Sequence, residues 1–182
     1  MYLNTPPWDT NVSPPELLSV IETMTPGCAL DIGCGTATNV ITLAERGWKV
    51  TGIDFIRKPV EHGRKKAKAA GVEVNLVVGD VTRLVLAEKF DLILDMGCFH
   101  NLSIPERRRY VQSIQNWLNP GGIFLLYGFH QPEGLKNTRG ISRSDVEILG
   151  QFLTLRSRKD GVDRQRMSSW LIYEKANRTN SL

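Results

Sequence analysis

Short apolar runs alternate along this chain with segments whose apolar residues recur every three or four positions. Runs of four to eight apolar residues bounded by turn residues predict buried strands, and the longer period predicts helices that pack by one face. The expected strands cover residues 29–32, 48–54, 72–78, 90–95 and 123–127. Strands and helices that alternate in this way predict an α/β fold with a parallel sheet.

Capping residues mark the expected helix boundaries. Ser13 is the expected N-cap of the first helix, followed by proline and by Glu16 as the second member of a capping box. Gly71 is expected to end the helix that begins at Arg57, and the run 103–106 is expected to start a later helix.

Near the carboxyl end, the pattern changes to strict alternation. Residues 152–159 and 164–173 alternate on either side of Asp160-Gly161, a dipeptide typical of hairpin turns. The run 119–122, Asn-Pro-Gly-Gly, is expected to be a turn between a helix and the strand 123–127. The chain therefore predicts a terminal antiparallel hairpin after its alternating strands and helices.

Composition limits the class of protein. The 182 residues, 41% of them hydrophobic, fit one globular domain with a buried core. We expect residues 1–27 to form an N-terminal lid segment and helix, 28–174 the main domain and 175–182 a polar tail. Three cysteines without paired spacing argue against a disulfide framework, and the chain has neither a membrane-length apolar run nor a signal-peptide pattern. These features predict a cytoplasmic protein.

The net charge of +4 is mildly basic, which is compatible with RNA binding without requiring it. Basic residues cluster at 57–68, 107–109 and 156–166. The first two clusters fall on helical patterns, so we expect them to be solvated helix faces.

A glycine turn follows the first expected strand. In the run 29–40 an apolar strand passes through Asp31, turns at Gly33 and Gly35 and opens into a helix. Glycines at such a turn let a ligand approach the main chain, at the strand edge where open α/β sheets bind nucleotides. A dinucleotide fingerprint would need a third glycine where Thr38 stands, so an oxidoreductase is the weakest interpretation.

The run 29–40 resembles motif I of the class I S-adenosylmethionine-dependent methyltransferases. Later landmarks extend the resemblance to about residue 173: Asp54 about 20 residues beyond the glycine turn, Gly79-Asp80, the run 95–102, and the Leu-Asn-Pro-Gly-Gly run from Leu118. The Pro-Pro-Trp-Asp opening, the Asp-x-Gly-Cys-Phe-His run and a late Ser-Ser-Trp resemble the small-molecule branch with thiopurine and tellurite-resistance methyltransferases.

The resemblance implies a Rossmann-like fold with a seven-stranded mixed sheet ending in an antiparallel hairpin. It also implies S-adenosyl-L-methionine as cofactor and S-adenosyl-L-homocysteine as product. The cofactor-binding residues that it implies are Asp31, Gly33, Cys34, Gly35 and Asn39 for the methionine part, Asp54 for the ribose, Phe55, Asp80 and Val81 for the adenine, and Asp95 and Met96 nearer the methyl group. The acceptor would meet Cys98, Phe99 and His100, with Tyr2 and Trp8 as a lid.

Two of these residues have alternative interpretations. His100 is either an acid–base group for a hydroxyl acceptor or a partly buried histidine that holds its loop. Cys98 is either a packing residue or a ligand for a soft metalloid substrate. His62 and His130 form no metal-ligand spacing with carboxylates, so we expect no metal.

We expect a small-molecule acceptor, either a soft sulfur, selenium or tellurium nucleophile or a hydroxyl, because the chain has no spare domain to dock a macromolecule. An RNA or protein methyltransferase guided by the basic clusters is the alternative. A second alternative is a non-catalytic module that binds S-adenosylmethionine. We expect a monomer or a weak homodimer, and no membrane partner.

Overall fold

The computed structural model describes residues 11–132, 134–135 and 138–177. The chain divides into two compact units, residues 1–84 and 85–182, and each is described by itself. Tyr2 and Trp8, the expected lid residues, lie outside the described residues.

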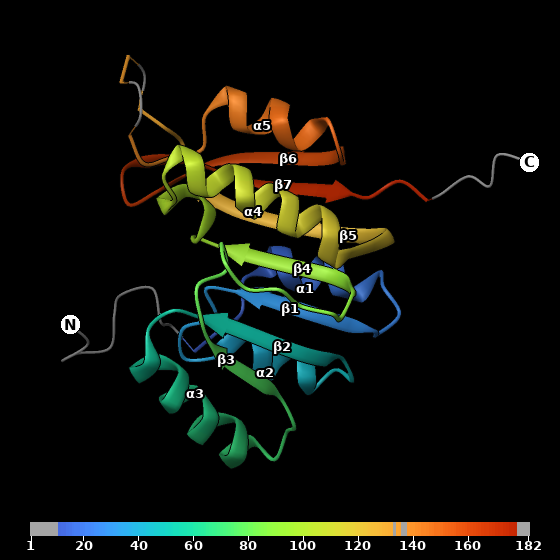
Figure 1. The fold of residues 1–182 in the computed structure, drawn as a ribbon. Helices are drawn as coiled ribbons and strands as arrows, with labels where there is room; N and C mark the ends of the chain where they lie inside the picture. The colour runs from blue at the N-terminus through green and yellow to red at the C-terminus, as the bar shows by residue number, and fades with distance from the viewer. Residues whose placement is uncertain (1–10, 133, 136–137, 178–182) are drawn as a thin grey trace, which may run out of the picture. The chain divides into compact units, whose positions relative to one another are not determined.

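Unit 1 is a parallel strand–helix alternation (Figure 1). Its elements are α1 (Pro15–Glu22), β1 (Cys28–Ile32), α2 (Thr38–Ala44), β2 (Lys49–Asp54), α3 (Arg57–Ala70) and β3 (Asn75–Val78). The strand β2 pairs in parallel with both β1 and β3, with Asp31 opposite Gly52 and Asp54 opposite Val78. The carboxyl ends of the three strands therefore lie at one edge, as the sequence pattern predicts.

Close packing fixes the glycine turn of unit 1 against its neighbours. A Cβ added at Gly52 would come within 2.7 Å of Leu76, 2.9 Å of Val40 and 3.0 Å of the Cys34 sulfur. A Cβ added at Gly63 of α3 would lie 2.9 Å from the Cβ of Ala37. These two glycines let β2 and α3 approach the turn more closely than any other residue would allow.

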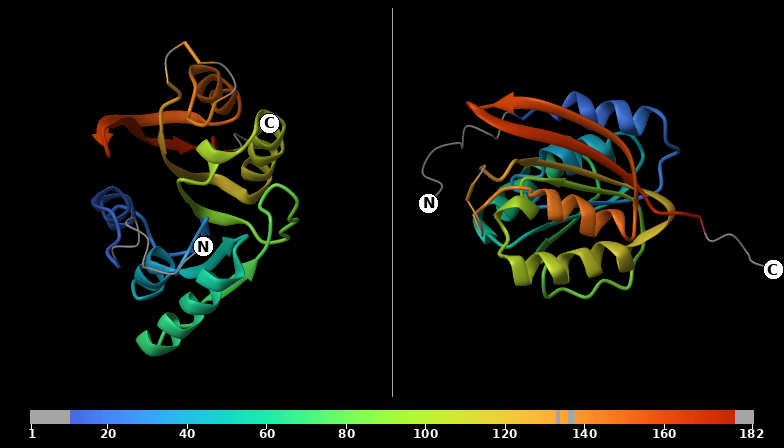
Figure 2. Two further views of the ribbon diagram at one scale, coloured as in Figure 1. Left: turned by 90° about the vertical axis from the view of Figure 1, so that its left-hand side faces the viewer. Right: turned by 90° about the horizontal axis from the view of Figure 1, so that it is seen from above.

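Unit 2 combines a parallel strand pair with an antiparallel hairpin. Its elements are β4 (Phe90–Met96), the 3₁₀ turn η1 (Phe99–Asn101), α4 (Ile104–Trp117), β5 (Leu118–Phe129), α5 (Arg143–Gly150), β6 (Thr154–Asp163) and β7 (Arg166–Glu174). The strand β5 pairs in parallel with β4 and antiparallel with β7, which pairs with β6. Both α4 and α5 cover the same face of these strands (Figure 2).

The hairpin turn lies later in the chain than the sequence predicted. Asp163 pairs with Arg166, so the turn residues are Arg164 and Gln165, at φ 49° and 62°. Asp160, expected in the turn, lies within β6 opposite Ser169, whose hydroxyl donates a hydrogen bond to its carboxylate (2.5 Å). This cross-strand bond fixes the register, and the two left-handed positions of the turn fall to non-glycine residues.

Two predicted element boundaries were also wrong. The helix α1 starts at Pro15 with Pro14 as N-cap. Ser13 lies one residue before the N-cap, and its hydroxyl donates to the side chain of Asn39 (2.9 Å). The expected turn 119–122 is instead the beginning of β5, which starts at Leu118 opposite Phe90. A register shift between Phe90 and Leu92 accommodates this irregular start.

The basic cluster 107–109 does not form one solvated face. Arg108 and Arg109 are exposed, but Arg107 is buried. Arg107 shares its helical stripe with the buried Tyr110 and Val111, and a charged group can occupy such a position only with a partner. Its partner is Asp145 of α5, 2.5 Å away.

The predicted fold class, an α/β fold with seven strands and an antiparallel carboxyl-terminal hairpin, is confirmed. The helix α3 ends at Gly71 with φ 70°, and Ser103 with Glu106 starts α4, both as predicted. Among the described residues, no helix is long and apolar enough to cross a membrane.

We expect Gly52→Ala to lower the free energy of unfolding by about 1–3 kcal/mol, because the added methyl overpacks the contact between β2, β3 and the glycine turn. Urea denaturation measures the change. Gly150→Ala is the control, because nothing lies within 4 Å of that position in the described structure and the change favours helix. Equal stability of the Gly52 variant and the wild type would contradict the packing argument.

Candidate functional site

The glycine turn after β1 provides an accessible main chain at the strand edge of unit 1. Gly33 and Gly35 have φ values of 75° and 52°, which side chains rarely adopt, and Gly33 is exposed. The N–H groups of Gly33 and Cys34 both donate to the carbonyl of Ile53 on β2, at 2.8 and 3.0 Å. The turn is therefore fixed to β2 before any ligand binds.

Cys34 points into the core and not toward a ligand. Its side chain is buried next to Gly52. Burial raises the pKa of the Cys34 thiol, and the negative charges of Asp31 and Asp54 act in the same direction. The group remains a neutral thiol, so any contact with a ligand would come from the backbone of Cys34.

Asp54 ends β2 and connects two turns. One carboxylate oxygen accepts the N–H of Gly35 (3.0 Å) and the other accepts the N–H of Ile56 (2.9 Å). A carboxylate has about four lone-pair positions, so both oxygens keep capacity for further donors such as the hydroxyls of a ribose. Asp54 is thus held rigidly by the backbone while it can still accept hydrogen bonds.

Two further acids lie in the same part of unit 1. Asp31 on β1 is buried. Asp80 follows β3, and its carboxylate accepts hydrogen bonds from the backbone N–H and hydroxyl of Thr82 (2.9 and 2.7 Å). The N–H of Gly79 donates to the carbonyl of Asp54 (3.0 Å), which joins the ends of β2 and β3. Of the adenine residues implied by resemblance, Phe55 is 75% exposed and Val81 is buried.

The segment that enters α1 is fastened to the glycine turn. The Lys66 ammonium on α3 donates to the side chains of Asn11 (2.7 Å), Thr36 (3.2 Å) and Thr38 (3.0 Å). The Ser13–Asn39 hydrogen bond attaches the same segment to the first turn of α2. Asn39, expected to bind the methionine part, is thereby fixed in place. The role of Lys66 in joining these segments was not predicted from the sequence.

In unit 2, Asp95 near the end of β4 organises the expected acceptor loop. Its carboxylate accepts the N–H groups of Cys98 (2.8 Å) and Phe99 (3.0 Å) and the hydroxyl of Tyr110 (2.5 Å). Burial raises the pKa of Asp95 to about 6, although these hydrogen bonds act to lower it. Asp95 therefore fixes the conformation of the loop. Met96, the next residue, is 40% exposed.

His100 lies in a narrow, electropositive space. A Cβ added at Gly128 would lie 2.8 Å from its Nδ1, and the ring of Phe129 packs against its edge at 5.4 Å. Burial lowers the pKa of His100 to about 4, and the charges of Arg166, Arg107 and Arg139 act in the same direction. His100 is therefore neutral at physiological pH.

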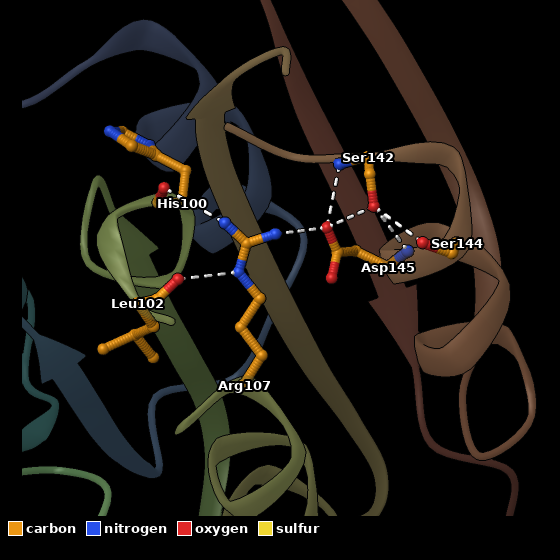
Figure 3. Close-up of polar contacts among 6 residues, drawn as sticks. All are labelled: His100, Leu102, Arg107, Ser142, Ser144 and Asp145. Carbon is orange, nitrogen blue, oxygen red and sulfur yellow. Dashed lines mark hydrogen bonds and ion pairs between the residues drawn. The ribbon is translucent and has the colours of Figure 1, made fainter. Parts of the chain in front are cut away.

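Arg107 holds the loop from its other side (Figure 3). The guanidinium donates to the carbonyls of Leu102 (3.0 Å) and His100 (3.3 Å) and pairs with Asp145, which also accepts the N–H and hydroxyl of Ser142. Phe99 is buried, with the Arg107 guanidinium 5.3 Å above its ring. Phe99 is thus a core contact of this network, and Cys98 beside it is half-buried.

Sequence reasoning missed an aromatic cluster on β5 and β7. Tyr127 lies 4.8 Å from Trp170 and 6.0 Å from Phe129, measured between ring centroids. The Arg166 guanidinium lies 4.3 Å above the Phe129 ring. All three rings are half-buried. The alternation of 123–129 contained this signal, because it places Tyr127 and Phe129 on one face of the strand.

The described residues contain no group of three or more histidine, cysteine or acidic side chains arranged to hold a metal ion. His130 and Asp160 do approach each other, but they meet at Ser169, to which His130 Nε2 lies at 2.6 Å. Because the single Ser169 proton is directed to Asp160, His130 is the donor in this contact, and the serine is not activated as a nucleophile.

Comparison with known proteins identifies the family. Residues 29–122 match the methyltransferase domain family, and the chain belongs to it. The chain is a class I S-adenosylmethionine-dependent methyltransferase, as the motif resemblance implied, and S-adenosyl-L-methionine is its cofactor.

Two curated relatives illustrate the match. A 2-heptyl-1-hydroxyquinolin-4(1H)-one methyltransferase of Mycobacteroides abscessus is 29% identical over 157 residues, 82% of this chain and 69% of that protein. A probable thiol methyltransferase 2 of Arabidopsis thaliana is 31% identical over 134 residues, 70% of this chain and 59% of that protein. The chain thus spans only part of each relative.

A solved structure supports the fold. The N-methyltransferase NodS of Bradyrhizobium japonicum, in complex with S-adenosyl-l-homocysteine, superposes with a TM-score of 0.77 at 19% identity, over 88% of this chain and 84% of that one.

The residues of unit 1 fit the cofactor chemically. S-adenosylmethionine presents an ammonium, two ribose hydroxyls and an adenine amine, all of which are hydrogen-bond donors. Asp31, Asp54 and Asp80 lie at or beside the carboxyl ends of three neighbouring parallel strands and supply acceptors. The exposed main chain at Gly33 leaves space for a ligand to approach.

We expect Asp54→Ala to weaken S-adenosylhomocysteine binding about 10- to 150-fold, because a ribose partner that carries charge is lost. Isothermal titration calorimetry measures the affinity. Asp54 also holds Gly35 and Ile56, so thermal unfolding must accompany the titration, and Glu61→Ala on the exposed face of α3 is the matched control. Unchanged affinity in a folded Asp54 variant would exclude the ribose role.

The low pKa of His100 makes stability depend on pH. The unfolded chain binds a proton at this position near pH 6.5, whereas the folded chain does so only near pH 4. The stability contributed by neutral His100 is therefore complete above about pH 6.5 and is lost as the pH falls toward about 4. When the pH is lowered from about 7.5 to about 5, we expect the free energy of unfolding of the wild type to fall by about 2 kcal/mol relative to that of His100→Gln.

Urea denaturation at both pH values tests this. Asp95, whose pKa is raised to about 6, acts in the opposite direction, but it is present in both proteins and cancels from the difference. Parallel stability profiles of wild type and His100→Gln would show that His100 is not held neutral.

Proposed function

We propose that this chain transfers the methyl group of S-adenosylmethionine to a small, flat acceptor that is already an anion near neutral pH, such as a thiolate or an acidic hydroxyl. The observation that carries the proposal is the environment of His100. The only base suggested by the sequence on the acceptor side has a pKa of about 4 and is surrounded by arginine charge. A base that weak does not deprotonate an ordinary alcohol effectively, because general-base catalysis needs matched pKa values.

With an acceptor that is already an anion, the reaction requires little chemical assistance from the protein. When bound, the cofactor supplies a methyl group on a sulfonium sulfur, which leaves as a neutral thioether. The protein then has to orient the nucleophile and exclude water. In this proposal Asp31, Gly33 and Gly35 hold the methionine part, Asp54 the ribose, and Asp80 with Val81 the adenine. The loop from Asp95 to His100 lines the acceptor position.

The aromatic cluster supports a flat acceptor. Tyr127, Phe129 and Trp170 offer half-buried rings for stacking, and Arg166 above Phe129 supplies positive charge. His100 contributes its neutral ring at the edge of Phe129. The two curated relatives are named for a hydroxyquinolinone and for thiols, which agrees with an acidic O–H or S–H acceptor.

We expect release of S-adenosylhomocysteine with aromatic thiols or N-hydroxylated aromatics, and none with aliphatic alcohols. The pH dependence of kcat/KM should follow the pKa of the acceptor, and His100→Ala should lower kcat less than about tenfold, where a general base would contribute about 10²–10⁴-fold. The control is the affinity of this variant for S-adenosylhomocysteine, which should be unchanged.

Three outcomes would contradict the proposal. Turnover of an aliphatic alcohol that His100→Ala abolishes would make His100 a general base. Methylation of bulk RNA that weakens steeply with salt would favour the macromolecular alternative. Cofactor binding without turnover across the panel would leave the non-catalytic module.

A further inference from the structure

A cavity of about 390 Å³ lies within unit 2, between α4, α5 and the segment that follows β5. Its volume falls within the range of about 300–1,000 Å³ typical of small-molecule sites. Ile104 and Val111 of α4 and Ile148 of α5 give it apolar walls. The buried pair of Arg107 and Asp145 is part of its lining. Phe99 of the acceptor loop also lines it, but the proposed function assigns no role to the lining residues of α4 and α5.

Two polar groups in the cavity have no partner among the described residues. Arg108 forms neither a hydrogen bond nor an ion pair there, whereas the neighbouring charge of Arg107 is balanced by Asp145. The Thr138 hydroxyl oxygen is buried and makes no hydrogen bond within the same residues. A buried hydroxyl without a partner is costly, so a ligand that accepts a hydrogen bond from it would be favoured.

The cavity is connected to the acceptor loop through two hydrogen bonds to one atom. The carbonyl oxygen of His100 accepts from the guanidinium of Arg107, which lines the cavity, and from the N–H of Gly140 (2.8 Å). Gly140 lies between Thr138 and Ser142, which also line the cavity. Figure 3 shows Arg107 between the carbonyls of the loop and the start of α5.

We propose that this cavity is an effector site for a small amphiphilic anion, with a carboxylate, sulfonate or phosphate on an apolar body. The anionic group pairs with Arg108 and accepts from Thr138, and the apolar body contacts Ile104, Val111 and Ile148. The bound anion restrains Thr138, its neighbour Gly140 and Arg107, and thereby the loop that carries His100. The inference does not depend on which acceptor is methylated.

Anilinonaphthalene sulfonate is a suitable probe, because it combines an aromatic body with one sulfonate. We expect the folded protein to bind one probe molecule, with fluorescence enhancement that persists at saturating S-adenosylhomocysteine. Arg108→Gln should weaken binding at least about tenfold by loss of the charged partner. Arg109→Gln is the matched control, because Arg109 is exposed like Arg108 but does not line the cavity, so the variant removes the same charge without altering the cavity.

A second variant tests the cavity independently of charge. Ile148→Trp places a larger side chain in the cavity and should abolish probe binding in protein whose thermal unfolding remains cooperative. Hydrogen exchange tests the connection: amides of residues 97–102 should exchange more slowly with the probe bound in wild type and Arg109→Gln, but not in Arg108→Gln.

Three results would overturn the inference. Equal loss of binding in the Arg108 and Arg109 variants would mean general attraction of an anion to a basic surface. Displacement of the probe by S-adenosylhomocysteine would assign it to the cofactor site. Probe binding without slower exchange at 97–102 would exclude an effector role. Failure of the proposed function would appear separately, in the acceptor panel, and would leave the probe experiments unaffected.

Discussion

The buried carboxylate of Asp95 is the constraint on which the acceptor side of this protein depends. A carboxylate removed from water is costly unless donors surround it, and here two backbone N–H groups and the Tyr110 hydroxyl do so. Those donors come from the loop after β4 and from α4, so satisfying Asp95 folds the loop over the strand end. The position of His100 in the turn that follows β4 is a consequence of these hydrogen bonds.

Asp54 in unit 1 is also a carboxylate at the end of a strand that needs hydrogen-bond donors, but its accessibility differs. It also ends a parallel strand and accepts backbone N–H groups, those of Gly35 and Ile56. Asp54 remains partly accessible, however, and Asp95 does not. An accessible acid can serve both the fold and a ligand, whereas a buried one serves the fold and acts on function through the groups that it positions. Burial thus separates a binding acid from a positioning acid.

The sequence predicted local features well because their causes are local. The glycine turn depends on the positive φ values of Gly33 and Gly35. The hydrogen bond from Ile56 to Asp54 at the end of β2 and the capping box of α4 each join residues within three positions of one another. The burial of Arg107 could not be derived in this way, because its partner Asp145 comes from another helix. The position of Arg107 on the apolar stripe of α4 was a signal, but only the partner makes a buried charge tolerable.

The predicted position of the hairpin turn was wrong for a related reason. Asp-Gly has the higher turn propensity, but the hydrogen bond between Ser169 and Asp160 acts across the strands and selects another register. The ligand roles of the individual residues remain predictions, since they depend on groups that do not belong to the chain. Contacts between residues close in the sequence could be predicted from the sequence, whereas pairing between distant residues could not.

The shift of the hairpin turn also affects how the protein behaves in a crowded solution. By extending β6 to Asp163, it leaves a long outer strand whose residues from Thr154 to Val162 are all exposed. Such an edge can recruit strands from other molecules. Arg156, Arg158 and Lys159 place three positive charges along it, so that a second copy of the strand approaching in parallel register would bring like charges together. The charged side chains therefore protect against aggregation at the edge that the displaced turn lengthens.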